Sequence, residues 1–262
     1  MRICFFIAAI CCGLIATAQF PYNPLPFKQP DFKKIKELGH RKLVVYRQSE
    51  EEKNVAFIVE YEKNGNITAM FERGTNDNGD SINTSETYYE FDAKGRLIGM
   101  NTTEVDYGEA RTLFTYDATG KLIRKQTATI DPPTYKYKYD AKGRLIEANV
   151  TQTMPAYEED GEWKGKTVEK PSNRYLYKYD AKGRLSEEWD YKLPMETKSD
   201  PPSYKTIWTY NDKNQVIQVR RINSEKTEMY REDYEYNKDG LISKRVFNDG
   251  DEDEVYYYEY SK

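Results

Sequence analysis

Few side chains of this sequence are suited to catalysis. The chain of 262 residues contains a single histidine, His40, and its three cysteines, Cys4, Cys11 and Cys12, all lie near the N-terminus. One histidine cannot build a histidine-based metal site, and a Ser-His-Asp triad would have to use His40 as its oriented base. We therefore predict no catalytic residue, no metal site and no cofactor, and we interpret His40 as a surface residue beside a helix end.

Acidic residues are numerous, but their spacing is typical of turns. The stretches 76–80 and 249–254 cluster oxygen ligands of the kind that calcium prefers, yet neither has EF-hand spacing. Asp, Asn and Gly are also the residues that hairpin tips require, and we interpret both stretches in that way. Adjacent acids such as Glu187-Glu188 do not define a glycosidase site, because that chemistry depends on the distance between two carboxyl groups in space.

Aromatic residues are the better candidates for ligand contacts. The connection 152–173 combines two aromatic residues with an acidic patch, which is the mixture of anchor and polar rim that binding sites favour. Inserted loops of repeat proteins often form a binding edge. The alternative is that the aromatic side chains only form the buried face of a sheet. As a hypothesis, we assign ligand contacts to Tyr157, Trp163, Trp189 and Trp208.

The first 18 residues have the features of a signal peptide. Arg2 precedes an apolar run from Ile3 to Ile15, and Ala16-Thr17-Ala18 supplies the small residues of a cleavage site. The run is shorter than the roughly 20 residues that a membrane-spanning helix needs. We predict a chain that is secreted, periplasmic or attached to the cell envelope, without a transmembrane segment after the signal peptide. An uncleaved anchor and a lipid-modified cysteine are the alternatives.

The composition disfavours two classes of partner. Removal of residues 1–18 leaves 39 Lys and Arg (40 minus Arg2) against 44 Asp and Glu, a net charge of 39 − 44 = −5. A mixed and slightly acidic surface argues against nucleic acid or an anionic membrane as partner. The 24 tyrosines can each bury a ring while the hydroxyl reaches water. Such a chain suits half-buried sheets better than a thick aliphatic core.

A short motif recurs through most of the chain. The hexapeptide Asp-Ala-Lys-Gly-Arg-Leu occurs three times without change, at 92–97, 140–145 and 180–185, each time after an aromatic residue. Four looser copies bring the number of copies to seven. Fixed self-similarity of this kind is the signature of a repeat architecture. The aromatic residues that begin the copies are Tyr61, Phe91, Tyr116, Tyr139, Tyr179, Tyr210 and Tyr236.

Each copy of the motif predicts a β-hairpin. Aromatic residues recur at every second position before the motif, as in Tyr135-Tyr137-Tyr139, which places them on one face of a strand. The Asp can then bond a type I turn, and the Gly can take the left-handed conformation that starts the return strand. Asn replaces Gly in one copy, and Asn is the non-glycine residue that best tolerates this conformation. The predicted turn residues are Gly65, Gly95, Gly120, Gly143, Gly183, Asn214 and Gly240.

These observations predict the fold class and the domains. We expect an all-β antiparallel meander of about seven Tyr-Asp type hairpin repeats that forms one long curved or twisted sheet. Residues 1–18 are the signal peptide, 19–41 a Pro-rich leader, and 42–262 the sheet domain. The leader includes a short helix within 31–39, where a cap, apolar spacing and a final Gly coincide.

At these motifs the chain resembles the Rhs/YD-repeat family, whose motif pairs a Tyr-Asp step with Gly-Arg-Leu. The resemblance covers roughly residues 55 to 260 and is strongest at the three identical copies. It implies a sheet of hairpins in an extracytoplasmic setting, where long family members form shells or stalks. Seven hairpins are too few to close a large shell, and no toxin-like domain follows the last copy. The resemblance therefore implies a fold and a location but no toxin cargo.

The leading functional hypothesis is a non-enzymatic extracytoplasmic binding or structural module of this repeat type. Its partner is expected among cell-surface glycans or proteins. The alternative is a carbohydrate-binding or carbohydrate-active protein that uses Trp and carboxylate side chains on a curved sheet. An enzyme should show convergent carboxylates of shifted pKa, whereas a scaffold should show even rows of Lys and Glu.

Overall fold

The described part of the chain is almost entirely β-structure. A computed structural model describes residues 34–49, 52–75, 80–128, 133–157, 163–194, 200–250 and 253–262. The predicted signal peptide, the cysteines and most of the Pro-rich leader lie outside these ranges. Within them, no helix has the length and apolar character needed to cross a bilayer.

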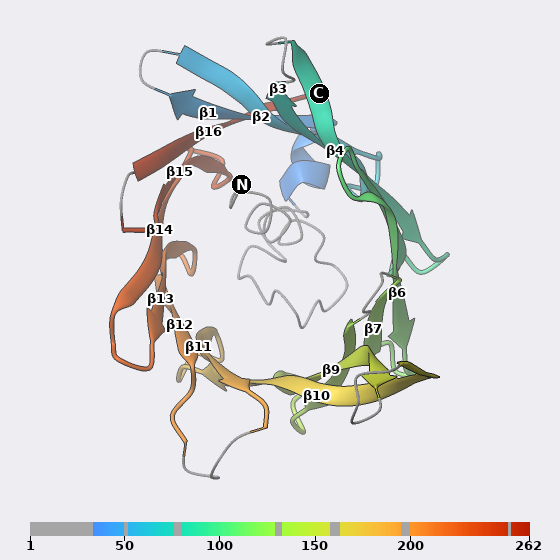
Figure 1. Cartoon of the computed structure of the whole chain (residues 1–262). Coiled ribbons are helices and arrows are strands. Elements are labelled where there is room, and N and C mark those ends of the chain that lie inside the picture. The colour runs from blue at the N-terminus through green and yellow to red at the C-terminus, as the bar shows by residue number, and fades with distance from the viewer. Residues whose placement is uncertain are drawn as a thin grey trace.

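Sixteen strands account for most of the described residues (Figure 1). In chain order they are β1 Lys42–Ser49, β2 Glu52–Tyr61, β3 Ile67–Thr75, β4 Ser81–Phe91, β5 Leu97–Glu104, β6 Gly108–Tyr116, β7 Leu122–Ala128, β8 Pro133–Tyr139, β9 Leu145–Tyr157, β10 Trp163–Tyr179, β11 Leu185–Lys192, β12 Tyr204–Tyr210, β13 Val216–Asn223, β14 Glu228–Tyr236, β15 Ile242–Asn248 and β16 Asp253–Ser261.

The strands form a closed barrel in which each pairs antiparallel with its neighbours in sequence. The predicted all-β antiparallel meander is therefore confirmed, but the predicted single long curved or twisted sheet of seven hairpin repeats is instead a closed barrel of sixteen strands. β1 pairs with β16 in a continuous register from Lys42↔Ser261 to Gln48↔Val255 and closes the ring. The physical reason is that a meander leaves two unpaired edges, and mutual pairing satisfies the backbone groups of both.

Seven turns of one type join the strands at one rim of the barrel. They connect β2–β3, β4–β5, β6–β7, β8–β9, β10–β11, β12–β13 and β14–β15, so the meander places them all at the same end. In the turn at Asp140, the Gly143 N–H donates to the Asp140 carbonyl at 2.9 Å. The residue at this fourth position has a φ between +61° and +87° in all seven turns, at Gly65, Gly95, Gly120, Gly143, Gly183, Asn214 and Gly240.

The aspartate of the motif holds the turn together. Asp140 Oδ1 accepts the backbone N–H groups of Lys142 and Arg144, both at 2.9 Å, and its Oδ2 accepts Arg144 Nε at 2.7 Å. The backbone bond from Arg144, followed by the other bonds, lowers the pKa of Asp140. The same contacts recur at the other two identical hexapeptides. The sequence is thus conserved within the chain because each side chain has a bonding role in the turn.

A tyrosine hydroxyl joins five of the seven hairpins to the hairpin before. Tyr179 Oη donates to the Leu145 carbonyl at 2.8 Å, across the boundary between two copies of the motif. The guanidinium of Arg144 lies over the Tyr179 ring, 4.7 Å from its centroid. Equivalent hydroxyl bonds, each 2.7 Å long, are Tyr116 to Leu97, Tyr139 to Leu122, Tyr210 to Leu185 and Tyr236 to Val216. We call this repeated contact the tyrosine latch.

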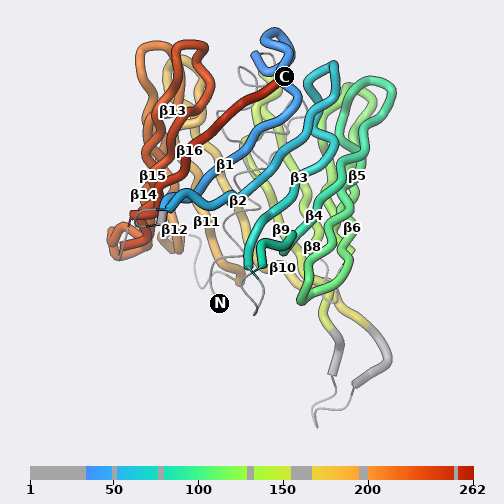
Figure 2. The backbone as a smooth tube through the Cα atoms, turned by 90° about the horizontal axis from the view of Figure 1, so that it is seen from above, coloured from blue at the N-terminus to red at the C-terminus, as the bar shows by residue number. Residues whose placement is uncertain are grey.

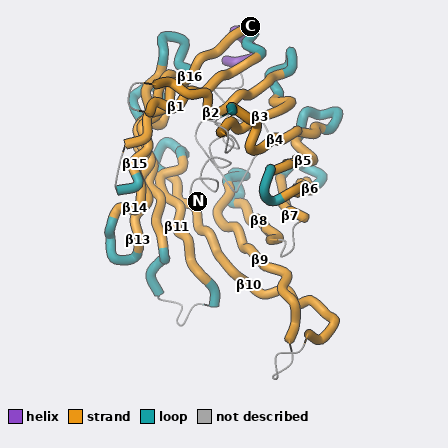
Figure 3. Tube along the Cα trace, turned by 45° about the horizontal axis from the view of Figure 1, so that its top comes forward, coloured by secondary structure: helices purple, strands orange, loops and turns teal. Residues whose placement is uncertain are grey.

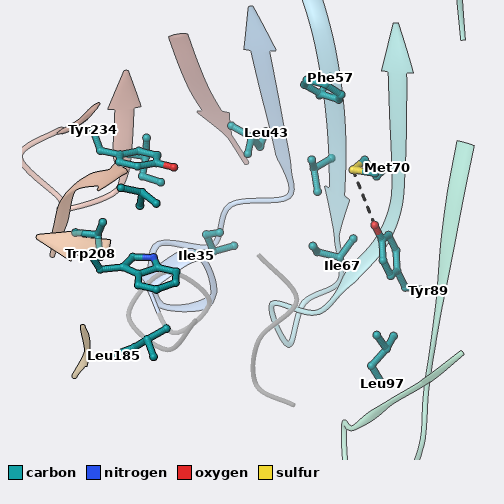
Figure 4. Close-up of a cluster of buried hydrophobic side chains, with 14 of the residues drawn as sticks. Ile35, Leu43, Phe57, Ile67, Met70, Tyr89, Leu97, Leu185, Trp208 and Tyr234 are labelled. Atoms are coloured by element: carbon teal, nitrogen blue, oxygen red, sulfur yellow. Dashed lines mark hydrogen bonds between the residues drawn. The ribbon is translucent and has the colours of Figure 1, made fainter. Parts of the chain in front are cut away.

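A helical turn over residues 34–38 lies inside the ring, beside β1 to β4 (Figure 1). It falls within the segment for which a helix is predicted. Ile35 on this turn is fully buried and belongs to the same cluster as Leu43, Val59 and Trp208. In Figure 4, Trp208 and Tyr234 extend from their strands toward the side on which Ile35 lies. The strand face that carries this cluster is therefore the inward face.

The inward and outward faces differ in chemistry. Cross-strand partners in an antiparallel pair share a face, so Tyr137↔Ala148 and Trp208↔Val219 are inward pairs. The alternate positions point outward and carry rows of charges. Outward ion pairs include Lys138–Glu147, Arg174–Glu147, Lys205–Glu187, Lys244–Glu235 and Arg111–Glu90, with N–O distances of 2.7 to 3.2 Å.

The segment 152–173 is mostly strand, so its interpretation as an inserted loop is wrong. β9 and β10 pair along Thr151–Pro155 and Thr167–Pro171 and extend beyond the rest of the ring at the rim opposite the seven turns (Figures 2 and 3). Residues 158–162 between them are outside the description. The paired residues include the β-branched Thr151, Thr153, Thr167 and Val168, which favour strand, and the two strands extend the ladder.

Replacement of Tyr179 by Phe tests the tyrosine latch. The variant loses the bond to the Leu145 carbonyl but keeps the ring, so we expect a loss of about 1 kcal/mol in the free energy of unfolding. Urea denaturation measures it. Tyr88→Phe is the control, because Tyr88 is 47% exposed and its hydroxyl bonds the side chain of Glu86 at the surface. Equal losses in the two variants would contradict a structural role for the latch.

Replacement of Gly143 tests the turn conformation. Its φ of +78° strains a β-branched side chain, so Gly143→Val should lose about 1 kcal/mol or more. Gly143→Asn should be milder, since Asn214 has a φ of +61° in the equivalent turn. The comparison needs only thermal melts of the two variants, and identical melting temperatures would disprove the assignment.

Candidate functional site

The four residues predicted to contact a ligand do not lie together. Trp208 on β12 is inward and 7% exposed. Trp189 on β11 is outward, because it pairs with Leu176, a neighbour of the inward Tyr177. Tyr157 and Trp163 face each other in register at the far ends of β9 and β10, and their side chains lie outside the description. These four residues therefore lie at separate places on the barrel, and of the two whose side chains are described only Trp208 is on the inward face.

Trp189 is part of the charged outward surface. Lys178 Nζ lies 3.3 Å from the centroid of its ring, and Lys205 Nζ lies 5.8 Å from the same centroid. Its Nε1 donates to Glu187 at 2.8 Å. The ring and the N–H of Trp189 are thus occupied by neighbouring side chains.

Trp208 has a different environment on the inward face. Val219 is its cross-strand partner, and Thr206 and Tyr210 flank it on the same strand face. Its Nε1 is buried and has no hydrogen-bond partner. The indole therefore presents an unused donor to the inside of the barrel.

An acidic pair lies beside Trp208 on the same face. Glu188 of β11 pairs in register with Thr206, two residues from Trp208. Asp190, two residues further along β11, accepts Asn173 Nδ2 at 3.1 Å and Arg221 Nη2 at 2.9 Å. Arg221 forms an ion pair with Asp190. The two carboxylates therefore share one cation, and Glu188 is the carboxylate without an ion pair of its own.

Burial raises the pKa of Glu188 to about 7. Arg221 opposes this shift, the charge of Asp190 adds to it, and a hydrogen bond from Tyr177 opposes it. Glu188 therefore exchanges its proton near neutral pH. Its neighbour Glu187 points outward, where burial is outweighed by hydrogen bonds from Lys205 and Trp189 that lower the pKa. Two adjacent glutamates thus titrate in opposite directions because they lie on opposite faces, and they cannot act together on one glycosidic bond.

A second charged pair is buried on the inward face of β14 and β15. Arg245 is 2% exposed and contacts Glu232, which is 8% exposed, at 2.9 Å. Tyr234 donates its hydroxyl to Glu232. The guanidinium of Arg245 lies 5.1 Å from the ring centroids of Phe247 and of Tyr256, while its Nε lacks a partner. A buried ion pair of this kind costs desolvation energy, so its retention points to a role other than simple stability.

These inward charges follow a sequence pattern that aromatic spacing alone misses. A β-bulge after each turn shifts the register, for example between Lys178 and Tyr179. Each return strand begins with a buried aliphatic residue, such as Leu185. Because of the bulge, the next residue that faces inward is three positions later, not two, as Glu188 is. That position holds Met70, Met100, Lys125, Ala148, Glu188, Val219 and Arg245. A charged residue at this position could have been detected from the sequence.

Within the described ranges, no group of three or more His, Cys, Asp or Glu side chains is placed to hold a metal ion. The acidic stretches 76–80 and 249–254 fall partly outside these ranges. His40 follows the helical turn, and its ring lies 5.5 Å from that of Tyr260. The inward face offers hydrogen bonds, charge and aromatic surface, which suit binding.

Comparison with known proteins shows a shared fold. No family model and no curated protein matches the chain. A porin-like protein from Bacteroides uniformis aligns over 85% of this chain and 98% of its own, with 12% identity and a TM-score of 0.54. A porin-like protein from Bacteroides vulgatus covers 83% of this chain and 97% of its own at 9% identity and a TM-score of 0.34. A LolA superfamily protein from Nitrosomonas europaea covers 89% and 91% at 7% identity and a TM-score of 0.27. Of these three, the first is similar enough to show a common fold.

The inferred membership of the Rhs/YD-repeat family is wrong. No family model matches any part of the chain, and a solved structure that shares its fold is a porin-like protein. The residues that carried the resemblance have local roles: Asp and Gly form the turn, and Tyr, Arg and Leu form the contact between hairpins. A motif set by turn chemistry can arise in any meander of tight hairpins.

The titration of Glu188 makes a testable pH profile. Its ordinary pKa of 4.5 rises to about 7 in the folded protein. The folded state then binds more protons than the unfolded state between these values, so this group lowers stability as pH rises from about 4.5 to about 7. Glu188→Gln mimics the protonated acid. We expect the variant to match the wild type near pH 5 and to exceed its stability at pH 8, measured by urea denaturation.

Glu187→Gln is the matched control for that profile. The pKa of Glu187 is lowered in the folded state, so its contribution to stability is present above 4.5 and is lost as pH falls through the folded pKa. This variant should be less stable than the wild type at pH 8. The same sign of change for both variants would show that the two carboxylates are not in opposite environments.

Proposed function

We propose that the chain is a non-enzymatic extracytoplasmic binding protein that holds an amphipathic ligand against the inward face of its barrel. The observation that carries the proposal is the division of chemistry between the two faces. Buried aromatic and aliphatic side chains line the inward face, whereas the outward face carries rows of ion pairs among exposed apolar residues such as Leu113. An apolar ligand would therefore find its complementary surface inside.

The outward face argues for contact with water. A barrel wall that faces lipid carries an apolar band, with charged residues disfavoured near its middle. Here Lys138, Glu147 and Arg174 form one row across β8, β9 and β10, and Lys205 pairs with Glu187 on β12 and β11. We infer that the barrel does not use its outer wall to bind lipid.

The number of strands supports internal binding. Strands spaced about 4.8 Å apart and tilted by roughly 40° give a ring of sixteen a diameter of roughly 30 Å. Eight-stranded barrels are filled by their own side chains, whereas barrels of this strand number are too wide for that. The helical turn at 34–38 lies inside this ring, and its Ile35 packs in the same cluster as Leu43 and Trp208.

We place the protein in the cell envelope or outside the cell. The apolar run from Ile3 to Ile15 with Ala16-Thr17-Ala18 supports export. The name of the Bacteroides uniformis neighbour, a porin-like protein, is consistent with such a location.

A carbohydrate ligand is the second candidate. It is favoured by the combination of aromatic rings with Glu188, Asp190 and Asn173 on one face, since sugars stack on rings and bond to carboxylates. A glycan screen run beside an apolar probe separates the two candidates. Binding to a glycan with no response to the apolar probe would favour the sugar.

The proposal predicts that N-phenyl-1-naphthylamine, a dye that fluoresces in apolar surroundings, binds saturably to the protein. Trp208→Ala should weaken this binding severalfold, because the indole is part of the inward wall. Trp189→Ala is the control and should leave binding unchanged, since Trp189 is outward. Fluorescence titration measures both. Absence of a saturable signal, or equal effects of the two substitutions, would refute internal binding.

A further inference from the structure

We infer that the polar head of the ligand is an uncharged hydrogen-bond acceptor, such as an ester or amide carbonyl, that accepts the N–H of Trp208. This inference rests on the proposed function and defines the chemical class of the ligand.

The first argument is the unused donor of Trp208. The residue is 7% exposed, and its Nε1 has no hydrogen-bond partner. A buried donor without a partner costs about 1 to 3 kcal/mol. An indole N–H can only donate, so the group that satisfies it must be an acceptor. Figure 4 shows the indole extending toward the inside of the barrel, on the side where Ile35 lies.

A second unused donor lies on the same wall. Arg245 is 2% exposed, and its Nε has no partner although its Nη2 bonds Glu232. A guanidinium also has donors alone. Trp208 on β12 and Arg245 on β15 are three strands apart, which is roughly 14 Å. A ligand with more than one carbonyl group matches this pair.

The charges nearby exclude an anionic head. Glu188 pairs with Thr206, so it is a diagonal neighbour of Trp208 at roughly 7 Å. Arg221 is already bound to Asp190 at 2.9 Å, and Arg245 to Glu232 at 2.9 Å. Arg221 pairs with Thr206 from the other side, so this cation is as near to Trp208 as Glu188 is. At pH 8 the two carboxylates of Glu188 and Asp190 outweigh the single charge of Arg221, and the resulting net negative charge disfavours a carboxylate or phosphate at Trp208. A neutral carbonyl satisfies the donor without this repulsion.

The apolar part of the ligand has a surface beside the donor. Val219 lies across from Trp208, and Leu185 and Val216 are buried in the same cluster. Ile35 of the helical turn belongs to it as well. These buried side chains make the surroundings of the indole apolar, so the part of the ligand next to the carbonyl should be apolar as well.

The experiment compares three molecules that share a twelve-carbon chain and differ in the head: N-methyldodecanamide, dodecanoate and dodecyltrimethylammonium. Each displaces N-phenyl-1-naphthylamine from the full chain at pH 8, below its micelle concentration. We expect the amide to bind most tightly. Trp208→Phe keeps an aromatic ring but removes the N–H, and it should weaken the amide about tenfold while changing the ammonium compound less than twofold. Trp189→Phe is the control.

Glu188→Gln tests the charge argument separately. It should tighten dodecanoate binding severalfold and leave amide binding unchanged, because only the anion is repelled by Glu188. Should Trp208→Phe fail to fold, the indole N–H resonances of the wild type give the same information. The chain has 3 tryptophans, so the signal of Trp208 can be assigned with Trp163→Phe and Trp189→Phe, and it should shift on addition of the amide.

The outcomes separate the two levels of the proposal. If the dye and all three molecules fail to bind, the proposed function and this inference both fail. If they bind but Trp208→Phe weakens all three alike, the indole only packs, and the inference fails while the proposed function stands. Tightest binding of the ammonium compound would also overturn the inference, since Glu188 would then select a cation.

Discussion

The barrel depends on the hydrogen bond from a tyrosine hydroxyl to the carbonyl of the preceding hairpin. In a meander each strand pairs only with its neighbours in sequence. The curvature of the sheet is therefore set by the change in orientation from each hairpin to the next, which is called the step here. The latch fixes that step with the same two groups at Tyr116, Tyr139, Tyr179, Tyr210 and Tyr236. Because the stacked arginine comes from the preceding turn, as Arg144 does on Tyr179, turn and step are coupled. The ring then closes where β1 meets β16, with Arg41 N–H bonded to Ser261 carbonyl at 2.7 Å.

The latch also explains why tyrosine replaces aliphatic residues in this chain. A ring packs on the inward face while its hydroxyl satisfies a backbone carbonyl near the rim, so one side chain serves both the core and the backbone. Burial raises the pKa of Tyr179 to about 12, which keeps the hydroxyl protonated and able to donate over the whole physiological range. A leucine at the same position would supply the apolar surface, but it could not form the hydrogen bond of the tyrosine latch.

The turns could be predicted from the sequence, whereas the pairing of strands that are far apart in the chain could not. Turn positions such as Gly143 and Asn214 follow from residue types within six positions of each other. Closure depends on β1 and β16, which are separated by the whole domain and carry no motif. The family assignment failed for a related reason, since the motif encodes a turn and a neighbour contact and nothing about how many hairpins follow. Trp208 could be placed on the inward face through its spacing from Tyr210. Trp189 could not, because the bulge after the turn reverses the alternation on β11.

The bulge has a further consequence for function. It brings the third residue after each buried aliphatic residue to the inward face, where most hairpins carry Met, Ala or Val. Lys125, Glu188 and Arg245 occupy that position instead. Arg245 is held by Glu232 and by two aromatic rings, so its charge is matched within the wall. Glu188 has no such cation of its own, and its neighbour Trp208 has no acceptor. The fold would form more easily with apolar residues at both places, since burying unmatched polar groups is costly. Glu188 on β11 and Trp208 on β12 are the two unmatched groups on adjacent strands, and a ligand that completes them best explains their presence.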